Sequence, residues 1–193
     1  MIERSEVEAL FGEWLSRIDN KELARKVVDA WMLGIERGRW ESMEELKKMP
    51  FTLVTDPMGI SFIEHTLAVT EGAVALAGAQ IRNYGKKLPY RINMDRLIAG
   101  GLLHDVGKLL EIEPDGQGGW RRSRNGKCLR HPISGVVLGS DVGLPDDVLN
   151  TIGAHAKEGE NRHQVIETIL IHQADFATFN PLVYLKNEKL ITL

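Results

Sequence analysis

Residues 97–110 read LIAGGLLHDVGKLL, and this stretch decides the fold because it is apolar nearly all round. A helix that is apolar on every side belongs in the interior of a protein, where other elements cover it. We therefore predict a central helix from about Asn93 to Leu110. The polar residues in the second half of this stretch are His104, Asp105 and Lys108.

The N-terminal part of the chain predicts two amphipathic helices. Apolar residues recur at three- and four-residue steps over 7–18, behind Ser5 and Glu8, which have the spacing of a capping box. A second pattern of the same kind runs over 23–35. An aromatic cofactor box is the alternative use of the tryptophans in this region, but we interpret them as packing anchors: Trp14, Trp31 and Trp40.

Further helices are predicted on both sides of the central one. Ser61 and Glu64 form another capping box, which opens a long Ala-rich helix over about 61–83. No strand pattern of any length competes with the helical ones. Three more helices are predicted beyond residue 130: HPISGVVLGSDV (131–142), PDDVLNTIGAHA (145–156, with Pro145 at its first position), and a last one opened by Asn161 and Gln164.

These patterns predict an all-α fold, namely a helical bundle with an N-terminal helical extension. We place a helical cap at 1–56 and one compact core at 57–193. The chain of 193 residues has the size of one domain, and its 43% hydrophobic and 26% charged residues are typical of a folded globular protein.

Charge and cysteine content narrow the classes of function. The formal net charge of -3 provides no global field that would recruit a nucleic-acid polymer or an anionic membrane. The single cysteine, Cys128, excludes an internal disulfide and fits a reducing compartment. Residues 1–12, MIERSEVEALFG, carry charges where a signal peptide needs an apolar run, so we expect a cytoplasmic protein with no membrane contact.

Six histidine and aspartate residues carry the candidate chemistry, and each lies on or at the end of a predicted helix. Imidazole and carboxylate groups suit divalent ions such as iron, manganese, nickel or zinc. Helical bundles build metal sites in their cores from side chains on facing helices, so residues far apart in sequence are able to converge. The candidates in chain order are His65, His104, Asp105, His131, His155 and Asp175.

The motifs around these six residues resemble the HD superfamily of metal-dependent phosphohydrolases. The resemblance covers roughly residues 60–180 and rests on His65 followed by four strings: HDVGK from His104, HPISG from His131, AHAKEG around His155, and QAD ending at Asp175. It implies an all-α HD-domain fold. It also implies two metal ions, one held by His65, His104, Asp105 and Asp175, the second by His131 and His155, with Asp105 bridging them.

Phosphate-binding residues are predicted from the same resemblance and from charge. By resemblance, Lys108 contacts a phosphate oxygen, and a surface lysine is the alternative. The polar, Gly-rich segment 114–130 contains Asn125-Gly126, which suits a type I′ hairpin turn. A basic hairpin at the mouth of the site would clamp further phosphates, and the alternative is a solvated surface loop. The basic residues of this segment are Arg121, Arg122, Arg124, Lys127 and Arg130.

The sequence leaves three functions open. The first is hydrolysis of a phosphoester or phosphoanhydride of a small nucleotide-like substrate by a metal-activated hydroxide. Its catalytic residues would be Asp105 and Lys108, and a homodimer is compatible with this function. The second is a di-iron oxygenase of the same fold, which would use the same six ligands. The third is a non-enzymatic nucleotide-binding protein, against which the complete ligand set argues. The basic segment favours the phosphohydrolase.

Overall fold

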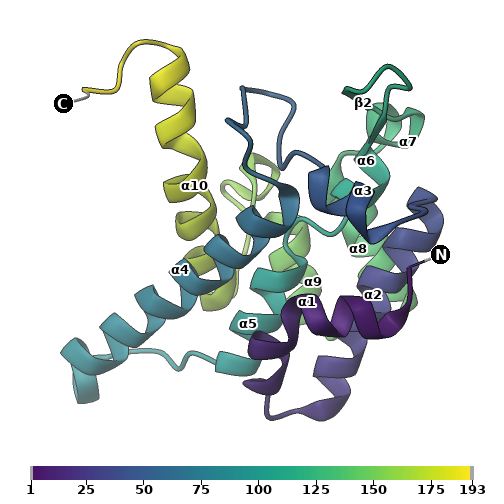
Figure 1. Ribbon diagram of the computed structural model, residues 1–193. Coiled ribbons are helices and arrows are strands. Elements are labelled where there is room, and N and C mark those ends of the chain that lie inside the picture. Colours follow the sequence, from purple (N-terminus) through teal and green to yellow (C-terminus); the bar gives the residue numbers. More distant parts are fainter. Residues whose placement is uncertain (1, 192–193) are drawn as a thin grey trace.

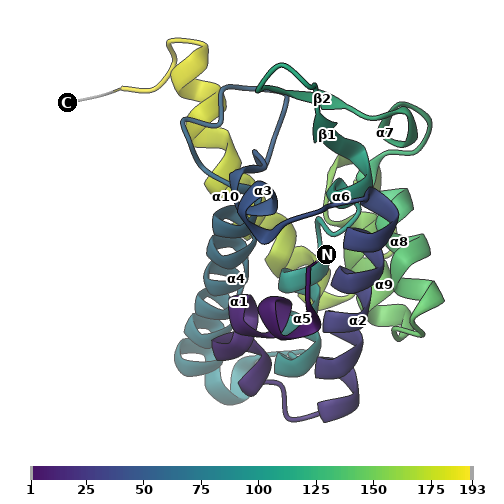
Figure 2. The same ribbon diagram turned by 45° about the vertical axis from the view of Figure 1, so that its right-hand side comes forward.

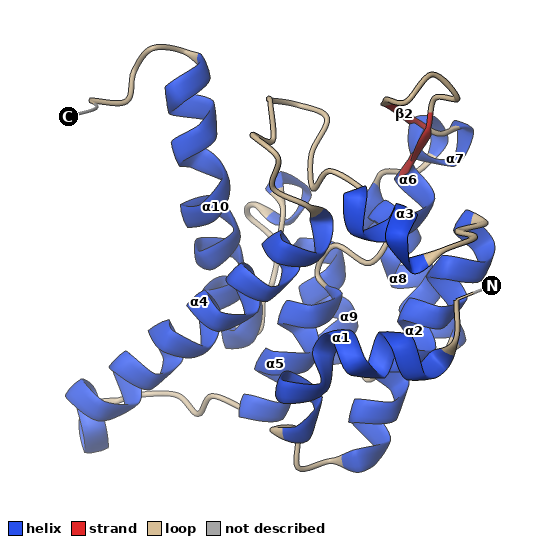
Figure 3. Cartoon of the chain, in the orientation of Figure 1, coloured by secondary structure: helices blue, strands red, loops and turns tan. Residues whose placement is uncertain are grey.

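Helix α5 (Met94–Leu103) lies at the centre of the computed structural model, which describes residues 2–191 (Figure 1). Every residue from Leu97 to Leu103 is buried. Helices α1, α2, α4, α9 and α10 all contact α5, so the apolar stretch is covered from several sides. The colouring by secondary structure shows helices and loops with a single small pair of strands (Figure 3). The predicted all-α fold is confirmed.

The predicted helix over 93–110 was wrong in its second half. Helix α5 ends at Leu103, a turn follows, and α6 is a separate short helix (Lys108–Glu111). Within the turn, backbone bonds connect residues three apart, such as Lys108 N to Asp105 O at 2.8 Å. In this turn, Gly107 lies directly against the backbone of the helix that begins at His131.

The N-terminal helices pack against the central stretch. Helices α1 (Arg4–Ser16), α2 (Lys21–Gly38) and α3 (Met43–Lys48) contribute side chains to the same hydrophobic cluster as α5 and α6. The predicted capping box at Ser5 was wrong: the structure forms it with Glu3 and Glu6, because the helix begins at Arg4. The proposed boundary after residue 56 remains a prediction.

Two tryptophans fix the position of α2 relative to the core. The indole of Trp31 donates a hydrogen bond from Nε1 to the carbonyl oxygen of Leu102 (2.9 Å), and that of Trp40 donates one to Leu109 (2.9 Å). Both rings are buried, at 0% and 5% exposure. Each indole therefore satisfies its own donor and a backbone acceptor near the HDVGK turn, as expected for packing anchors.

Helices α4 (Phe62–Tyr84) and α10 (Ile166–Lys186) pack together on one side of α5. The α4 helix confirms the prediction over 61–83, with Ser61 and Glu64 in a capping box. The helix predicted to open at Asn161 begins at Ile166 instead. Asn161 has φ of 64°, and a residue in this left-handed region cannot continue a right-handed helix.

Helices α8 (His131–Asp141) and α9 (Asp146–Ala154) pack against each other on the other side of α5. The first residue of α9 is Asp146 and Pro145 is its N-cap, so the helix begins one residue later than predicted. Short 3-10 turns occupy Gly85–Lys87 and Lys157–Gly159, and the second of them follows α9 closely. Helix α8 begins at the candidate ligand His131, and α9 ends just before the candidate ligand His155.

A small hairpin stands beside α6 (Figure 2). Strand β1 (Ile112–Pro114) pairs antiparallel with β2 (Trp120–Arg122), and the side chain of Asp115 organises the turn by accepting bonds from two backbone amides. The turn predicted at Asn125-Gly126 was wrong, since these residues lie in α7 (Arg124–Cys128). The hydroxyl of Ser123 caps that helix by accepting from Gly126 N at 2.9 Å.

None of the helices within residues 2–191 combines the length and the apolar character that a membrane span requires.

Candidate metal centre

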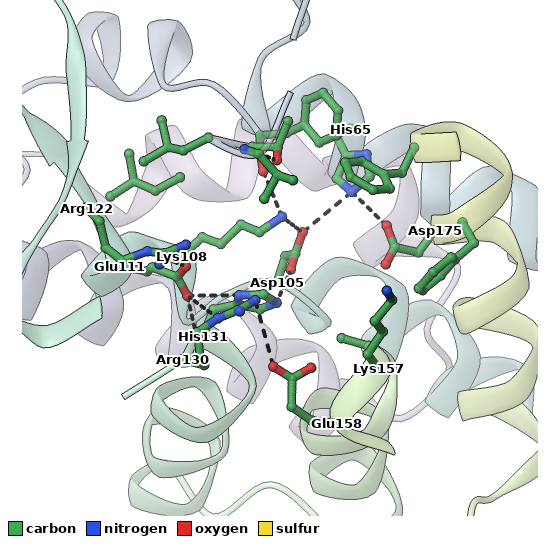
Figure 4. Close-up of a pocket in the computed structure, with 18 residues that line it drawn as sticks. His65, Asp105, Lys108, Glu111, Arg122, Arg130, His131, Lys157, Glu158 and Asp175 are labelled. Atoms are coloured by element: carbon green, nitrogen blue, oxygen red, sulfur yellow. Dashed lines mark hydrogen bonds and ion pairs between the residues drawn. The ribbon is translucent and has the colours of Figure 1, made fainter. Parts of the chain in front are cut away.

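The fold brings the six predicted ligands together around one point. Figure 4 shows four of them, which line a pocket: His65, Asp105, His131 and Asp175. The six ligands come from five different places: the first turn of α4, the turn after α5, the first residue of α8, the residue after α9, and the middle of α10. Five of them are buried and the sixth, Asp175, is partly exposed. Helix ends and turns therefore hold five of the ligands, namely His65, His104, Asp105, His131 and His155, and the middle of α10 holds Asp175.

Asp105 occupies the middle of this cluster. Its Oδ1 lies 3.2 Å from His131 Nε2 and 3.4 Å from His155 Nε2. Its Oδ2 lies 3.3 Å from His104 Nε2 and 3.5 Å from His65 Nε2. Each carboxylate oxygen thus faces one pair of histidines, which is the arrangement that a bridging ligand needs.

The candidate ligand atoms divide into two groups of three. His65, His104 and Asp175 form one group, and Asp105, His131 and His155 form the other. Within each group the ligand atoms lie within 4.8 Å of one another. In the first group, Asp175 Oδ1 is 3.2 Å from His65 Nε2.

Unpaired polar atoms in the centre indicate that the residues fit metal ions. The Nε2 atoms of His65, His104 and His155 and the Oδ1 atom of Asp105 are buried and make no hydrogen bond to any described residue. A buried polar atom without a partner costs about 1–3 kcal/mol. Four such atoms pointing at one spot are explained by divalent ions that accept their lone pairs, since imidazole nitrogen and carboxylate oxygen both ligate such ions.

The outer nitrogens of the histidines are held by neighbouring groups. Nδ1 of His104 lies 2.7 Å from the Gly101 carbonyl oxygen, and Nδ1 of His155 lies 2.9 Å from that of Ile152. Nδ1 of His131 lies 2.9 Å from the Glu111 carboxylate. An acceptor at Nδ1 places the proton there and leaves Nε2 free to bind a metal, as in known metal-ligating histidines.

Electrostatics support an ionised Asp105 and a neutral His131. Burial alone would raise the pKa of Asp105, but the charge of Lys108 holds this pKa well below its usual value. Burial lowers the pKa of His131, which favours the neutral imidazole. These are the protonation states in which both side chains bind metal.

Glu111 is a member of the site that the sequence reasoning missed. Its Oε2 also accepts a hydrogen bond from His131 N at 2.6 Å, so it fixes both the backbone and the ring of this histidine. Burial would raise the pKa of Glu111, yet the hydrogen bonds from His131 keep this pKa below its usual value. A signal was present, because Glu111 is the first acidic residue after the apolar stretch that contains the HDVGK string.

We expect Glu111→Gln to weaken metal affinity by about 10- to 100-fold, because an outer partner that orients a ligating histidine typically contributes that much. The amide would keep the size of the side chain but would lose the charge that fixes the Nδ1 proton of His131. Titration of the metal-free variant with Mn²⁺ would measure the effect. An affinity equal to that of the wild-type protein would show that Glu111 has no such role.

A pocket of about 370 Å³ opens beside the cluster. Asp105, His65, His131 and Asp175 lie on its wall. Apolar side chains line another part: Phe51, Leu53, Val54, Ile112, Phe176 and Phe179. The pocket is thus large enough for a small organic molecule that reaches the candidate metal ligands.

The structure separates the predicted phosphate-binding residues into two sets. Lys108, Arg122 and Arg130 line the pocket, whereas the other three do not: Arg121, Arg124 and Lys127. Arg121 forms an ion pair with Glu113 at 2.9 Å on the hairpin. The basic segment therefore faces the pocket only in part.

Lys108 is already engaged within the protein. Its ammonium group contacts Asp105 Oδ2 and donates a hydrogen bond to the carbonyl oxygen of Phe51 at 2.7 Å. It connects the central carboxylate to the loop over 50–61, whose ends are joined by a hydrogen bond from Phe62 N to Met49 O at 2.7 Å. Lys108 therefore acts on the shape of the pocket as well as on its charge.

The rings of Trp120 and His172 contact other parts of the protein. Trp120 stacks on Trp40 with ring centroids 5.9 Å apart, so its indole face packs on the protein itself. His172 contacts the backbone carbonyl oxygen of His155 through Nδ1. It thus fixes the chain next to a candidate ligand.

The fold and this centre define a class: an all-α protein with a buried histidine and aspartate cluster suited to divalent metal ions. The sequence matches the HD domain family over residues 62–177, which is more than half of the chain. The chain belongs to the HD domain family, a superfamily of metal-dependent phosphohydrolases.

Curated relatives with significant similarity include proteins named ribonuclease Y from Thermotoga petrophila and Thermotoga maritima. Each is 28% identical over 117 residues, which is 61% of this chain. The matched region spans only 18% of the length of these relatives. No solved structure gives a significant match.

Proposed function

We propose that the protein hydrolyses a phosphoester or phosphoanhydride bond of a small nucleotide-like substrate with the help of two divalent metal ions. The observation that carries this proposal is the set of unpaired, buried ligand atoms that converge around Asp105 at the wall of a pocket lined by basic side chains. Metal ligands and phosphate-binding cations side by side are the two components that phosphoryl hydrolysis needs.

Each of the two groups of candidate ligands would hold one metal ion. His65, His104 and Asp175 would hold one ion and His131 and His155 the other, with Asp105 shared between them. Manganese and iron suit this set of nitrogen and oxygen ligands, as do nickel and zinc. When bound, two such ions acidify water and neutralise phosphate oxygens.

The residues of the protein contribute orientation and charge. Glu111 and the backbone carbonyls fix the histidine rings so that their Nε2 atoms face the centre. Lys108 compensates the charge of Asp105 and holds the loop at Phe51 over the pocket. Both contributions are made before a substrate arrives, so little reorganisation is needed during the reaction.

The pocket supports a substrate of small size. Its volume of about 370 Å³ lies within the usual range for sites that bind small molecules. Phe176 and Phe179 give it an aromatic wall, which favours a flat or apolar group such as a nucleobase. The net charge of -3 argues against a polymer of nucleic acid as the main ligand, although the relatives carry the name of a ribonuclease.

Hydrolysis of a panel of substrates, measured by chromatographic separation of the products, tests this proposal. The panel contains nucleoside mono- and triphosphates, dinucleoside polyphosphates, cyclic dinucleotides and a short oligoribonucleotide, with Mn²⁺ present or removed by a chelator. We expect one of the small nucleotides to be hydrolysed at least ten times faster than the oligoribonucleotide, and the activity to vanish on chelation. Preference for the oligoribonucleotide would contradict the small substrate, and oxygen consumption by iron-loaded protein without any hydrolysis would identify an oxygenase instead.

A further inference from the structure

The basic side chains that line the pocket differ in whether a carboxylate already neutralises them. Lys108 is paired with Asp105. Arg122 lies 3.4 Å from Glu111, and Arg130 lies 3.6 Å from the same carboxylate and 3.8 Å from Glu158. The fourth pocket cation is Lys157, which forms neither an ion pair nor a side-chain hydrogen bond with any residue in the described range 2–191.

The position of Lys157 is set by a candidate metal ligand. It begins the 3-10 turn Lys157–Gly159, two residues after His155. His155 is buried and is tethered through its ring to Ile152 O and through its backbone to His172. The backbone that carries Lys157 therefore keeps a short, fixed separation from the metal centre.

The side chain of Lys157 points into the pocket (Figure 4). Its amino group lies on the side of Asp175, while the neighbouring Glu158 extends toward Arg130. It approaches the centre from the side opposite Lys108 and Arg122. A substrate phosphate placed at the centre would thus meet positive charge from two directions.

The charge balance of the pocket also favours an anion at this position. Four carboxylates and four basic side chains line it, so with neutral histidines its formal charge is zero: Asp105, Glu111, Glu158 and Asp175 against Lys108, Arg122, Arg130 and Lys157. Two divalent ions would add four positive charges. A ligand with several negative charges would restore the balance, and the cation that is free to contact it directly is Lys157.

We propose that Lys157 is a substrate-binding residue that contacts a non-bridging phosphate oxygen of the scissile group. This proposal rests on the proposed function for the identity of the substrate, but the binding of a phosphate group at Lys157 does not require that hydrolysis occurs. An ammonium group carries three donors on a flexible stem, so it is able to follow the phosphate as its charge distribution changes.

The test measures binding of inorganic phosphate to Mn²⁺-loaded protein by calorimetry, together with kcat and KM for the best substrate of the panel. We expect Lys157→Met to weaken phosphate binding and to raise KM by about tenfold or more, because a hydrogen bond to a charged group is lost. Metal content should be unchanged. Lys157→Arg should recover most of the phosphate affinity, since it keeps the charge and the donors.

The matched control is Lys86→Met, which removes one exposed charge in the 3-10 turn Gly85–Lys87, away from the pocket. It should leave phosphate affinity within twofold of the wild-type value. Unchanged phosphate affinity in Lys157→Met with normal metal content would overturn the assignment. Wild-type protein that binds phosphate but hydrolyses no ester would overturn the hydrolase and leave the assignment of Lys157 standing.

Discussion

Replacing Asp105 with alanine is expected to abolish metal binding and substrate hydrolysis together. Asp105 faces all four candidate histidine ligands through its two oxygens, at 3.2–3.5 Å. Loss of an outer partner alone costs 10- to 100-fold in metal affinity, so the loss of a ligand shared by both ions should cost more than about 10³-fold. Elemental analysis and a hydrolysis assay with the best substrate of the panel, on the same sample, would measure both effects.

The fold of the Asp105 variant needs its own control. Removing this carboxylate leaves the ammonium group of Lys108 without its partner, and breaking a buried pair costs about 3–5 kcal/mol. Asp105→Asn keeps the shape and an acceptor for Lys108, and should lose metal and activity with less loss of stability. Circular dichroism should show wild-type helical content for both variants. Full activity or two bound ions in either one would refute the role of Asp105.

The second large effect is expected at Gly107, the glycine of the HDVGK string. A Cβ atom added there would lie 2.1 Å from His131 O and 2.6 Å from Gly135 N. Its φ of -65° is ordinary for any residue, so the restriction comes from this close approach of two backbones and not from backbone conformation. Gly107→Ala must push α8 away from the turn that carries His104 and Asp105.

We expect Gly107→Ala to lower the free energy of unfolding by at least about 3 kcal/mol, the upper end of the cost of overpacking, because backbone cannot rearrange as a side chain does. For a protein of this size the melting temperature would fall by roughly 6–12 °C. Metal affinity should fall as well, since His131 would move relative to Asp105. Thermal unfolding and Mn²⁺ titration would measure the two effects.

Gly12→Ala is the matched control for the substitution at Gly107. Gly12 lies inside α1, is exposed, and has no atom within 4 Å of the added Cβ. Alanine should therefore stabilise the helix by about 0.5–1 kcal/mol. If Gly107→Ala behaved like Gly12→Ala, the close packing of the HDVGK turn against α8 would not matter for the site.

The sequence predicted the helical class and the family because both depend on local patterns. The capping box at Ser61 and the three- and four-residue spacing of apolar residues are set by the backbone of one helix. Five of the six ligands lie at helix ends or turns, and Asp175 lies inside α10. The resemblance, and not the spacing, supplied the expectation that these residues form one centre.

Features that depend on contacts between distant segments were not predictable in this way. The turn after Leu103 places Gly107 directly against α8, a segment more than twenty residues later, and the local sequence pattern carries no sign of this contact. The Asn125-Gly126 pair lies in a helix that packs against Glu111, to whose carbonyl oxygen Ser123 N donates at 2.9 Å, although the dipeptide alone favours a hairpin turn. Lys157 lines a pocket that forms only in the folded chain, and Glu111 contacts the ring of His131, which lies twenty residues away in the sequence.

The most direct test of the central claim is the rate of hydrolysis of the best substrate of the panel, measured against the number of Mn²⁺ equivalents added to metal-free protein. The two ligand groups around Asp105 predict that activity rises with added metal and reaches its plateau at two ions per chain. A plateau at one ion would contradict the binuclear centre. Metal-loaded protein that hydrolyses no substrate of the panel at any loading would contradict the phosphohydrolase itself.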